Sequence, residues 1–284
     1  MFSVITSTYN GNSYIPRLFA MLEANALSVQ VEYPDLQVEY VIVNDSPWEP
    51  LVLPETENLH FSCKTLVNPE NYGIHKSRAR GIGACSGALI TILDQDDEIA
   101  DDFLLSQYKA LGTADAVICN GWKELDNGVK PIYRDKAKMH LVNEKLFYLK
   151  AANQIVSPGQ CMLRKDAIPA AWLDNPQKVN GSDDLFLWLL MLDRGTRFIK
   201  NPEKLYTHKQ VGDNLSNSLK KMCKSDLEMC QLLRQKQLLP EKDIRKRERM
   251  CAFLQCCGYR NRPNLSALLL YPDIIALKAF AYYI

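Results

Sequence analysis

Residues 88–97 read Ala-Leu-Ile-Thr-Ile-Leu-Asp-Gln-Asp-Asp, a short apolar run that ends directly in three carboxylates. The apolar part, residues 88–93, has the length and the β-prone composition of a strand. Asp94, Asp96 and Asp97 would then crowd together just beyond the end of that strand. The junction predicts an acidic loop at one edge of a sheet.

Strand-like and helix-like segments alternate ahead of this junction. The predicted strands are 2–8, 38–43, 61–67 and 88–93, and the predicted helices are 14–26 and 75–84. Such alternation is typical of a parallel sheet flanked by helices. Ligands bind these sheets beyond the carboxyl ends of the strands, where the loops meet. We therefore expect loops 7–10, 44–46 and 94–97 to form one site.

The second half of the sequence is less regular. A loop-rich stretch covers residues 126–139, and a charged helical pattern runs from 217 to 257 with Pro240 between two predicted helices. Further predicted elements are strands at 116–120, 161–163 and 197–199 and a helix at 183–192. The simplest division is one α/β domain with a helical C-terminal extension.

The bulk properties exclude some classes of protein. The 284 residues carry a net charge of +1, and 47% of them are hydrophobic. A chain of this size can bury a full core, and its charge gives no field that would draw in nucleic acid. The first residues lack the basic start and apolar stretch of a secretory signal, so a cytoplasmic location is expected. The nine cysteines are odd in number and scattered, which favours reduced thiols.

The acidic loop allows two interpretations. Mutual repulsion among Asp94, Asp96 and Asp97 is costly without a cation or hydrogen-bond donors. Hard oxygen ligands at this density suit Mg²⁺ or Mn²⁺. Alternatively, the loop is a solvated acidic turn that caps the next helix, because Asp101 and Asp102 follow closely. The cluster alone leaves both interpretations open.

Four segments, in order along the chain, resemble the motifs of family 2 GT-A glycosyltransferases. They are residues 3–10 (Ser-Val-Ile-Thr-Ser-Thr-Tyr-Asn), 41–46 (Val-Ile-Val-Asn-Asp-Ser), 73–81 and 93–97. The resemblance spans residues 2–216. It implies a Rossmann-like nucleotide-diphospho-sugar transferase fold of the α/β class with a mixed, mainly parallel sheet. The implied division is a catalytic domain at 1–216, with a donor part at 1–105 and an acceptor part at 106–216, and a helical extension at 217–284.

By this resemblance, Ser7, Thr8 and Tyr9 would cradle the nucleotide base, with Tyr9 offering a stacking face. Asp45 would accept a hydrogen bond from the imide of the base, which favours uracil. The family usually has Asp at position 44 and Pro or Thr at position 7, so Asn44 and Ser7 are departures. The alternative is an ordinary turn that the Asp45 carboxylate stabilises.

The same resemblance implies how the diphosphate is held. Arg78 or Arg80 would contact it, because a guanidinium group binds phosphate oxygens well. The alternative is an ordinary solvated helix face. Asp94 and Gln95 would face the donor, with Asp94 approaching the ribose.

Asp96, together with Asp94 and His208, would hold Mn²⁺ or Mg²⁺. Asp97 would be an outer ligand or a group on the acceptor side. His208 lies in a stretch that resembles the family's closing loop, residues 205–210 and 214–216. Many family members have Arg just before this His.

In this chain Thr207 stands at that position, so Lys209 would supply the charge. A lone His such as His208 is otherwise more often structural or exposed.

Asp183 and Asp184 begin a predicted apolar helix, where the helix dipole favours negative charge. By the resemblance, Asp184 is the general base that takes the proton of the acceptor hydroxyl. Asp183 stands where the family has Glu. The alternative is plain N-capping. Gln160 and Trp188 are candidates for sugar contacts, although a Trp on an apolar helix is also typical of a core.

The resemblance therefore predicts an inverting hexosyl- or N-acetylhexosaminyl-type transferase. Its donor would be a UDP-sugar or another nucleotide sugar, and its acceptor a hydroxyl of a glycan or lipid-linked saccharide in polysaccharide or glycolipid biosynthesis. One alternative is a nucleotidyltransferase, although residues 10–13 are not the Gly-rich phosphate loop expected there. Another is a binding module for nucleotide sugars that has lost turnover.

The C-terminal part raises the question of a membrane. Residues 242–249 are rich in basic side chains, and residues 265–284 are apolar but interrupted by Pro272, Asp273 and Lys278. This pattern is too broken for a transmembrane helix but is compatible with a helix lying on the inner face of a membrane. The alternative is that these helices pack on the catalytic domain.

Overall fold

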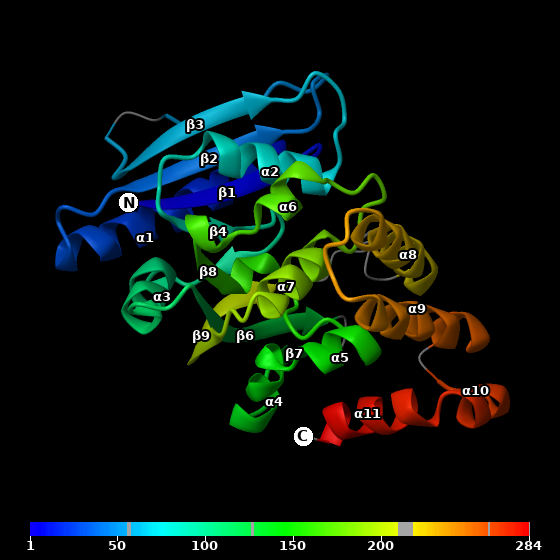
Figure 1. Cartoon of the computed structure of the whole chain (residues 1–284). Helices are drawn as coiled ribbons and strands as arrows, with labels where there is room; N and C mark the ends of the chain where they lie inside the picture. The colour runs from blue at the N-terminus through cyan, green and yellow to red at the C-terminus, as the bar shows by residue number, and fades with distance from the viewer. Residues whose placement is uncertain (56–57, 126–127, 210–217, 261, 284) are drawn as a thin grey trace. The chain divides into compact units, whose positions relative to one another are not determined.

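The structure is a computed structural model that describes residues 1–55, 58–125, 128–209, 218–260 and 262–283. It divides into two compact units, whose elements are labelled in Figure 1. The first unit comprises Met1–Tyr133, Val156–Ile168 and Thr196–Val211, and the second comprises Arg134–Ile155, Pro169–Gly195 and Gly212–Ile284. This division by packing is drawn differently from the predicted boundary at residue 216, which stays a prediction about functional domains.

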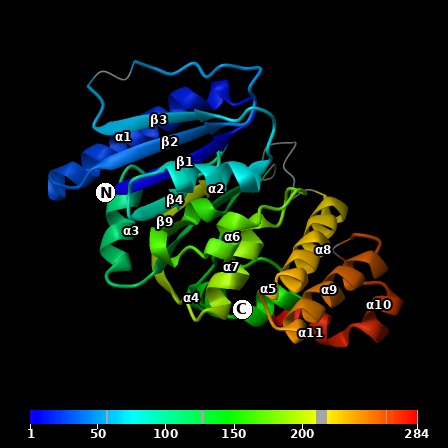
Figure 2. The same ribbon diagram turned by 45° about the horizontal axis from the view of Figure 1, so that its top comes forward.

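The first unit is built on one nine-stranded sheet within the described residues, in the order β3-β2-β1-β4-β8-β6-β9-β5, with β7 paired to β6. The strands are β1 (Phe2–Thr8), β2 (Val38–Asn44), β3 (Phe61–Val67), β4 (Leu89–Ile92), β5 (Glu98–Ile99), β6 (Ala116–Leu125), β7 (Gly128–Pro131), β8 (Cys161–Arg164) and β9 (Phe198–His208). Strands β3, β2, β1 and β4 are parallel and lie side by side (Figure 2). Only β5, β7 and β8 run against the others in the described part, so the predicted mixed, mainly parallel α/β sheet is confirmed.

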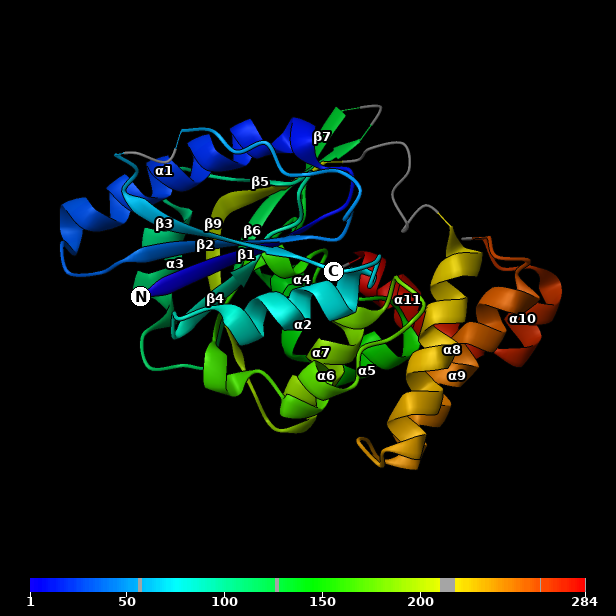
Figure 3. The same cartoon turned by 90° about the horizontal axis from the view of Figure 1, so that it is seen from above.

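Helices cover both faces of this sheet, which explains why its central strands β1, β2 and β4 are almost entirely buried. Helix α1 (Ile15–Glu32) and α3 (Phe103–Leu111) pack on the face that carries Val4, Tyr40 and Ile42. Helix α2 (Ile74–Ala84) lies on the opposite face (Figure 3). There Gly81 approaches Ile5 so closely that a Cβ would lie 2.4 Å from its Cγ2 atom. All seven residues of β2 are buried as a result.

The predicted strands and helices of the first hundred residues are confirmed, but β9 is a correction. We predicted a strand only at 197–199 and a loop at 205–210, whereas β9 runs from Phe198 to His208. It pairs with β6 across two register shifts, where Gly121 allows the backbones to approach. A Cβ at Gly121 would lie 2.2 Å from the carbonyl oxygen of Tyr206. The polar sequence of β9 hides this long-range pairing.

The second unit is helical. Its helices are α4 (Lys136–His140), α5 (Lys145–Lys150), α6 (Ala170–Asp174), α7 (Asp183–Asp193), α8 (Leu219–Gln235), α9 (Glu241–Cys256), α10 (Leu265–Leu270) and α11 (Pro272–Tyr283). Pro240 separates α8 from α9 as predicted, whereas the stretch predicted to be loop-rich contains β7 and α4. Trp188 on α7 is fully buried, so the structure favours the core interpretation of this residue. All nine cysteines are free thiols. No described helix is long and apolar enough to cross a membrane.

Candidate active site

The three predicted loops meet at the carboxyl ends of β1, β2 and β4. The side chain of Gln95 makes two hydrogen bonds to the backbone of Tyr9, one of 3.0 Å from Tyr9 N and one of 3.3 Å to Tyr9 O. The Asp45 N–H donates to the carbonyl oxygen of Thr8 at 2.8 Å. The first, second and fourth strands in sequence therefore deliver their loops to one place, as the alternation predicts.

Two exposed aromatic side chains lie in these loops. Tyr9 is 48% exposed and Trp48 is 60% exposed, and their rings meet edge to face with centroids 5.9 Å apart. The indole N–H of Trp48 donates to Oδ1 of Asn10 at 3.3 Å. Exposed apolar side chains that lie together are a feature of ligand-binding and interaction surfaces. Sequence reasoning missed Trp48, and its position directly after the Asn-Asp-Ser-Pro turn was the available signal.

Asp45 has a structural role. Its carboxylate is buried and accepts hydrogen bonds from Asn68 Nδ2 at 2.6 Å, Tyr72 N at 2.7 Å and Gly73 N at 2.9 Å. These bonds hold the chain just before α2. The turn-stabilising alternative for Asp45 is therefore observed, and its contact with a base stays a prediction.

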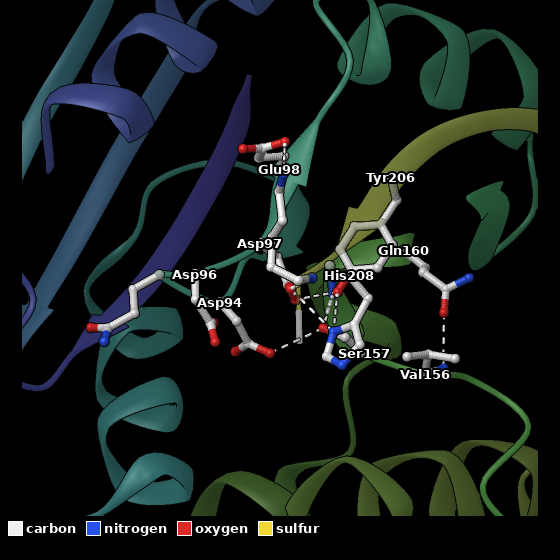
Figure 4. A network of polar contacts seen from close by, with 12 residues as sticks. Asp94, Asp96, Asp97, Glu98, Val156, Ser157, Gln160, Tyr206 and His208 are labelled. Carbon is white, nitrogen blue, oxygen red and sulfur yellow. Dashed lines mark hydrogen bonds and ion pairs between the residues drawn. The ribbon is translucent and has the colours of Figure 1, made fainter. Parts of the chain in front are cut away.

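The two arginines of α2 have different partners. The buried Arg78 forms an ion pair with Asp94, whose other oxygen accepts a hydrogen bond from Ser157 Oγ at 3.1 Å (Figure 4). Arg80 instead donates to the carbonyl oxygen of Val67, away from the acidic loop. Arg78 is thus the arginine of α2 beside the acidic loop. Ser157 joins the set although its sequence gave no signal beyond its place before β8.

Asp97 is fully buried and is held by three donors from the end of β9. The Tyr206 hydroxyl donates to it, and His208 Nδ1 and Lys209 N lie 3.1 and 3.0 Å from its Oδ1 atom (Figure 4). Burial raises the pKa of Asp97, against the effect of the His208 hydrogen bond. Burial alone would lower the pKa of His208, but the Asp97 hydrogen bond outweighs it and raises the pKa. Asp97 therefore anchors β9 to the acidic loop and engages one nitrogen of His208.

Asp96 is different, because within the described residues no side chain donates a hydrogen bond to its carboxylate. Burial, followed by the neighbouring carboxylates Asp97 and Asp94, raises its pKa to about 6. Arg17 contacts the loop only through its backbone, donating to the carbonyl oxygens of Gln95 at 3.2 Å and Asp96 at 2.9 Å. The structure thus holds a half-buried carboxylate in a field of like charge, which a cation would relieve.

The residues present fit a divalent cation of a particular kind. The described residues contain no group of three or more His, Cys, Asp or Glu side chains that could hold a metal by themselves. Asp94 and Asp97 already accept hydrogen bonds, which leaves Asp96 as the main candidate ligand. Mg²⁺ and similar ions bind through one or two carboxylates when substrate phosphates complete the coordination shell. The donor set fits that arrangement.

Lys209, which we expected to supply positive charge, lies between two carboxylates. Its Nζ atom is 3.0 Å from Glu98 and 2.9 Å from Glu124. Of the predicted closing loop, Gln210 and residues 214–216 lie outside the described residues.

Gln160, a candidate for sugar contact, is fully buried. Its Nε2 donates to the carbonyl oxygen of Cys119 at 3.1 Å, and its Oε1 accepts from Val156 N at 2.8 Å. The structure assigns it to the framework instead, where it joins β6 to the segment before β8.

Asp183 and Asp184 belong to the second unit, in the first turn of α7. Asp183 is buried, and its carbonyl oxygen accepts a hydrogen bond of 2.7 Å from the Trp172 indole. Asp184 is half-buried, and Asn153 Nδ2 donates to its Oδ2 atom at 2.6 Å. Its Oδ1 accepts from Leu185 N at 2.7 Å. Asn153 carried no recognisable motif in the sequence.

The sequence profile described as Glycosyl transferase family 2 matches residues 3–170, more than half of the chain. The chain belongs to this family. Membership confirms the predicted family and sets aside the nucleotidyltransferase alternative. The matched residues include the acidic loop at 94–97.

Similar proteins agree with this membership. The Bacillus subtilis (strain 168) protein named "Putative glycosyltransferase EpsH" is 28% identical over 152 residues, which is 52% of this chain and 42% of that protein. The chain thus matches less than half the length of this curated relative.

Solved structures share the fold with this family 2 chain. The S. aureus TarS 1–349 complex with UDP-GlcNAc is 15% identical with a TM-score of 0.60, over 99% of this chain and 79% of that one. The mannosyltransferase PcManGT from Pyrobaculum calidifontis, in complex with GDP-Man and Mn²⁺, is 13% identical with a TM-score of 0.55, over 99% and 84%. These likenesses confirm the GT-A type of α/β fold.

Proposed function

We propose that this glycosyl transferase family 2 chain transfers a sugar from a UDP-sugar, or another nucleotide sugar, to a hydroxyl of a glycan or lipid-linked saccharide, with inversion. The observation that carries the proposal is the meeting of three strand-end loops around the uncompensated carboxylate of Asp96. The solved neighbours with UDP-GlcNAc, or with GDP-Man and Mn²⁺, support a nucleotide-sugar donor.

In the donor site, Tyr9 and Trp48 offer ring faces to the nucleotide base. Base–aromatic stacking stabilises a bound base by about 1–3 kcal/mol. Ser7 and Thr8 would line the same end of β1. Arg78 holds Asp94 in place from α2, and Asp94 would approach the ribose.

Asp96 would hold Mn²⁺ or Mg²⁺ together with the donor diphosphate, with His208 and Asp94 adjacent. The bound ion would supply positive charge to the departing nucleoside diphosphate. The chain itself partly buries these carboxylates and keeps the Asp96 carboxylate free of hydrogen bonds from the described side chains. It also holds His208 against Asp97.

Asp184 is the proposed general base. As the acceptor oxygen attacks C1 of the sugar, its proton passes to the Asp184 carboxylate, and the bond between C1 and the phosphate oxygen breaks. The bonding electrons leave with the nucleoside diphosphate. Asn153 holds the Asp184 side chain in position through a hydrogen bond of 2.6 Å. Asp183 would support this turn of α7.

The donor is tested first by screening UDP-, GDP- and dTDP-sugars for Mn²⁺-dependent binding and slow donor hydrolysis. We expect a UDP-sugar to raise the melting temperature of the wild type only with Mn²⁺, and this effect to be lost with EDTA or in Asp96→Asn. Binding of none of the donors would overturn the proposal.

The base is tested with Asp184→Asn, which should lower transfer by roughly 10²- to 10⁴-fold. Donor affinity should be unchanged in this variant. Normal transfer by Asp184→Asn would show that another group takes the proton.

We also propose a peripheral contact with an anionic lipid surface through α10 and the end of α11. Helix α10 buries only Ala267, and its exposed side chains include Leu265 and Leu269. The exposed Arg260 and Arg262 lie five and three residues before its first residue, which favours negatively charged lipid over a neutral partner. A lipid-linked acceptor would lie at such a surface.

A further inference from the structure

The loop that leads into α7 is fastened along its length to α8, within the second unit. The carboxylate of Glu228 accepts from the backbone N–H groups of Lys178 at 3.1 Å and Val179 at 2.7 Å. The Ser225 hydroxyl donates to the carbonyl oxygen of Val179 at 2.8 Å and accepts from Ser182 N at 3.0 Å. Two side chains of one helix thus satisfy four backbone groups of this loop.

Gly181 shows that the fit is close. Its φ is +138°, a backbone conformation that residues other than glycine rarely adopt. A Cβ there would lie 3.0 Å from Met222 Sδ and 3.4 Å from Ser225 Cβ, both on α8. The loop passes α8 without room for a side chain, so its path into α7 is set by that helix.

A buried polar chain continues from this loop to α9. Ser182, the residue before α7, donates from Oγ to Asp226 Oδ1 at 2.6 Å. Arg247 of α9 forms an ion pair with the other oxygen of Asp226. Ser182, Asp226 and Arg247 are all buried. A buried ion pair is weak evidence for stability, since apolar side chains of the same volume often serve equally well.

The same arginine also contacts the segment that precedes Asn153, the hydrogen-bond partner of Asp184. Arg247 Nη1 donates to the carbonyl oxygen of Tyr148 on α5 at 2.9 Å. Five residues after Tyr148, Asn153 donates to Asp184. Arg247 therefore braces both chain segments that determine where the Asp184 carboxylate lies, one through Asp226 and Ser182 and one through α5.

We propose that Ser182, Asp226 and Arg247 are positioning residues for the general base, so that helices α8 and α9 orient Asp184 for proton transfer. The inference rests on the proposed function of Asp184 and extends it to the helical C-terminal part. Small displacements of a reacting group lower rates steeply, because the group must lie within hydrogen-bond reach of the proton it takes.

The test compares Ser182→Ala and Asp226→Asn with a matched control, Arg234→Gln. Arg234 also joins α8 to α9, but through half-exposed ion pairs to Glu241 and Glu248 instead of through Ser182 and Asp226. Transfer is measured as kcat and KM for donor and acceptor, beside donor affinity and the melting temperature.

We expect Ser182→Ala to lower kcat for transfer roughly 10- to 100-fold, with donor affinity and KM for the donor unchanged. Asp226→Asn should act in the same direction, and Arg234→Gln should keep the wild-type kcat. Ser182→Ala removes one hydroxyl without adding volume, so it keeps the test informative if Asp226→Asn does not fold.

The outcomes separate the two proposals. If Asp184→Asn abolishes transfer while folded Ser182→Ala keeps the wild-type kcat, the brace is wrong and the base stands. If Asp184→Asn transfers normally, the base itself is wrong. Equal loss of kcat in Arg234→Gln would show a general effect of loosening α8 and α9, and would also overturn the brace.

Discussion

At the scale of single residues, the acidic loop separates into side chains with different duties. The Asp97 carboxylate accepts hydrogen bonds from the end of β9, and Asp94 forms an ion pair with Arg78. Asp96 keeps its charge without such compensation, and its pKa is raised to about 6, first by burial and then by its neighbours. Asp102 precedes α3 without a side-chain capping bond. The simple capping interpretation of the acidic segment therefore lacks support.

Trp48 gives a prediction at this scale. Trp48→Ala should weaken binding of the donor nucleotide about tenfold, or roughly 1.4 kcal/mol, because the indole ring beside Tyr9 is no longer available for stacking. The value of kcat should change little, since the nucleotide base of the donor is remote from the reacting carbon of the sugar. Val52→Ala, an equally exposed change in the same segment, is the control. Titration calorimetry with UDP measures both, and equal affinity of Trp48→Ala and wild type would contradict the prediction.

Glu39 gives a prediction about pH. Burial by itself raises the pKa of Glu39, but hydrogen bonds from Ser3 and Ser86 outweigh burial and hold the pKa below its ordinary value. A depressed pKa in the folded state means that the stabilisation is present above the unfolded value, about 4.3, and is lost as the pH falls through the folded value.

Glu39→Gln should therefore lower the free energy of unfolding at pH 7 by about 1–2 kcal/mol, and by less at pH 3. Denaturation by urea at both pH values measures the difference. Glu32→Gln, on the exposed surface of α1, should change stability little at either pH. A loss that stays constant between pH 7 and pH 3 would rule out the titration of Glu39 as its cause.

At the scale of elements, β9 matters most to the site. It carries Tyr206 and His208 to Asp97, and it pairs with β6 across the register shifts beside Gly121. The local sequence of β9 is polar and contains Pro202, which argues against a long strand in isolation. Pairing with β6 overrides that local preference.

Gly121→Ala tests this pairing. The added Cβ would meet the carbonyl oxygen of Tyr206 at 2.2 Å, so the two strands must separate. We expect a loss of about 1–3 kcal/mol of stability and a parallel loss of transfer activity. Gly83→Ala on α2 is the matched control, because nothing lies within 4 Å of its Cβ. That change should stabilise the chain by about 0.5–1 kcal/mol. An unchanged melting temperature of Gly121→Ala would contradict the close approach of β6 and β9.

At the scale of the whole molecule, the sheet unit and the helical unit take different shares of the proposed reaction. The sheet unit contains the candidate donor residues, and the helical unit contains Asp184 and the helices that brace it. The helical unit also carries the exposed apolar side chains of α10.

The lipid contact is predicted at this scale. The wild type should co-sediment with vesicles that contain anionic phospholipid. Leu265→Glu/Leu269→Glu should lose most of this binding, because two exposed apolar side chains are replaced by negative charges that the anionic lipid repels. Val31→Glu on α1 is an equally exposed control and should bind like the wild type. Absence of wild-type binding at low salt, or equal binding by the double variant, would refute the contact.

The sequence by itself was sufficient for the α/β class, the parallel direction of the early strands and the meeting of loops at Tyr9, Asp45 and Asp94. The reason is that mainly apolar runs of strand length and helical periodicity are local signals, and parallel strands bring their carboxyl ends to the same edge of the sheet. Only the tertiary structure decided the length of β9, the partners of Asp97 and the fastening of Ser182 to Asp226 and Arg247. These contacts join residues more than twenty positions apart, and polar side chains reveal their partners only when folding has buried them together.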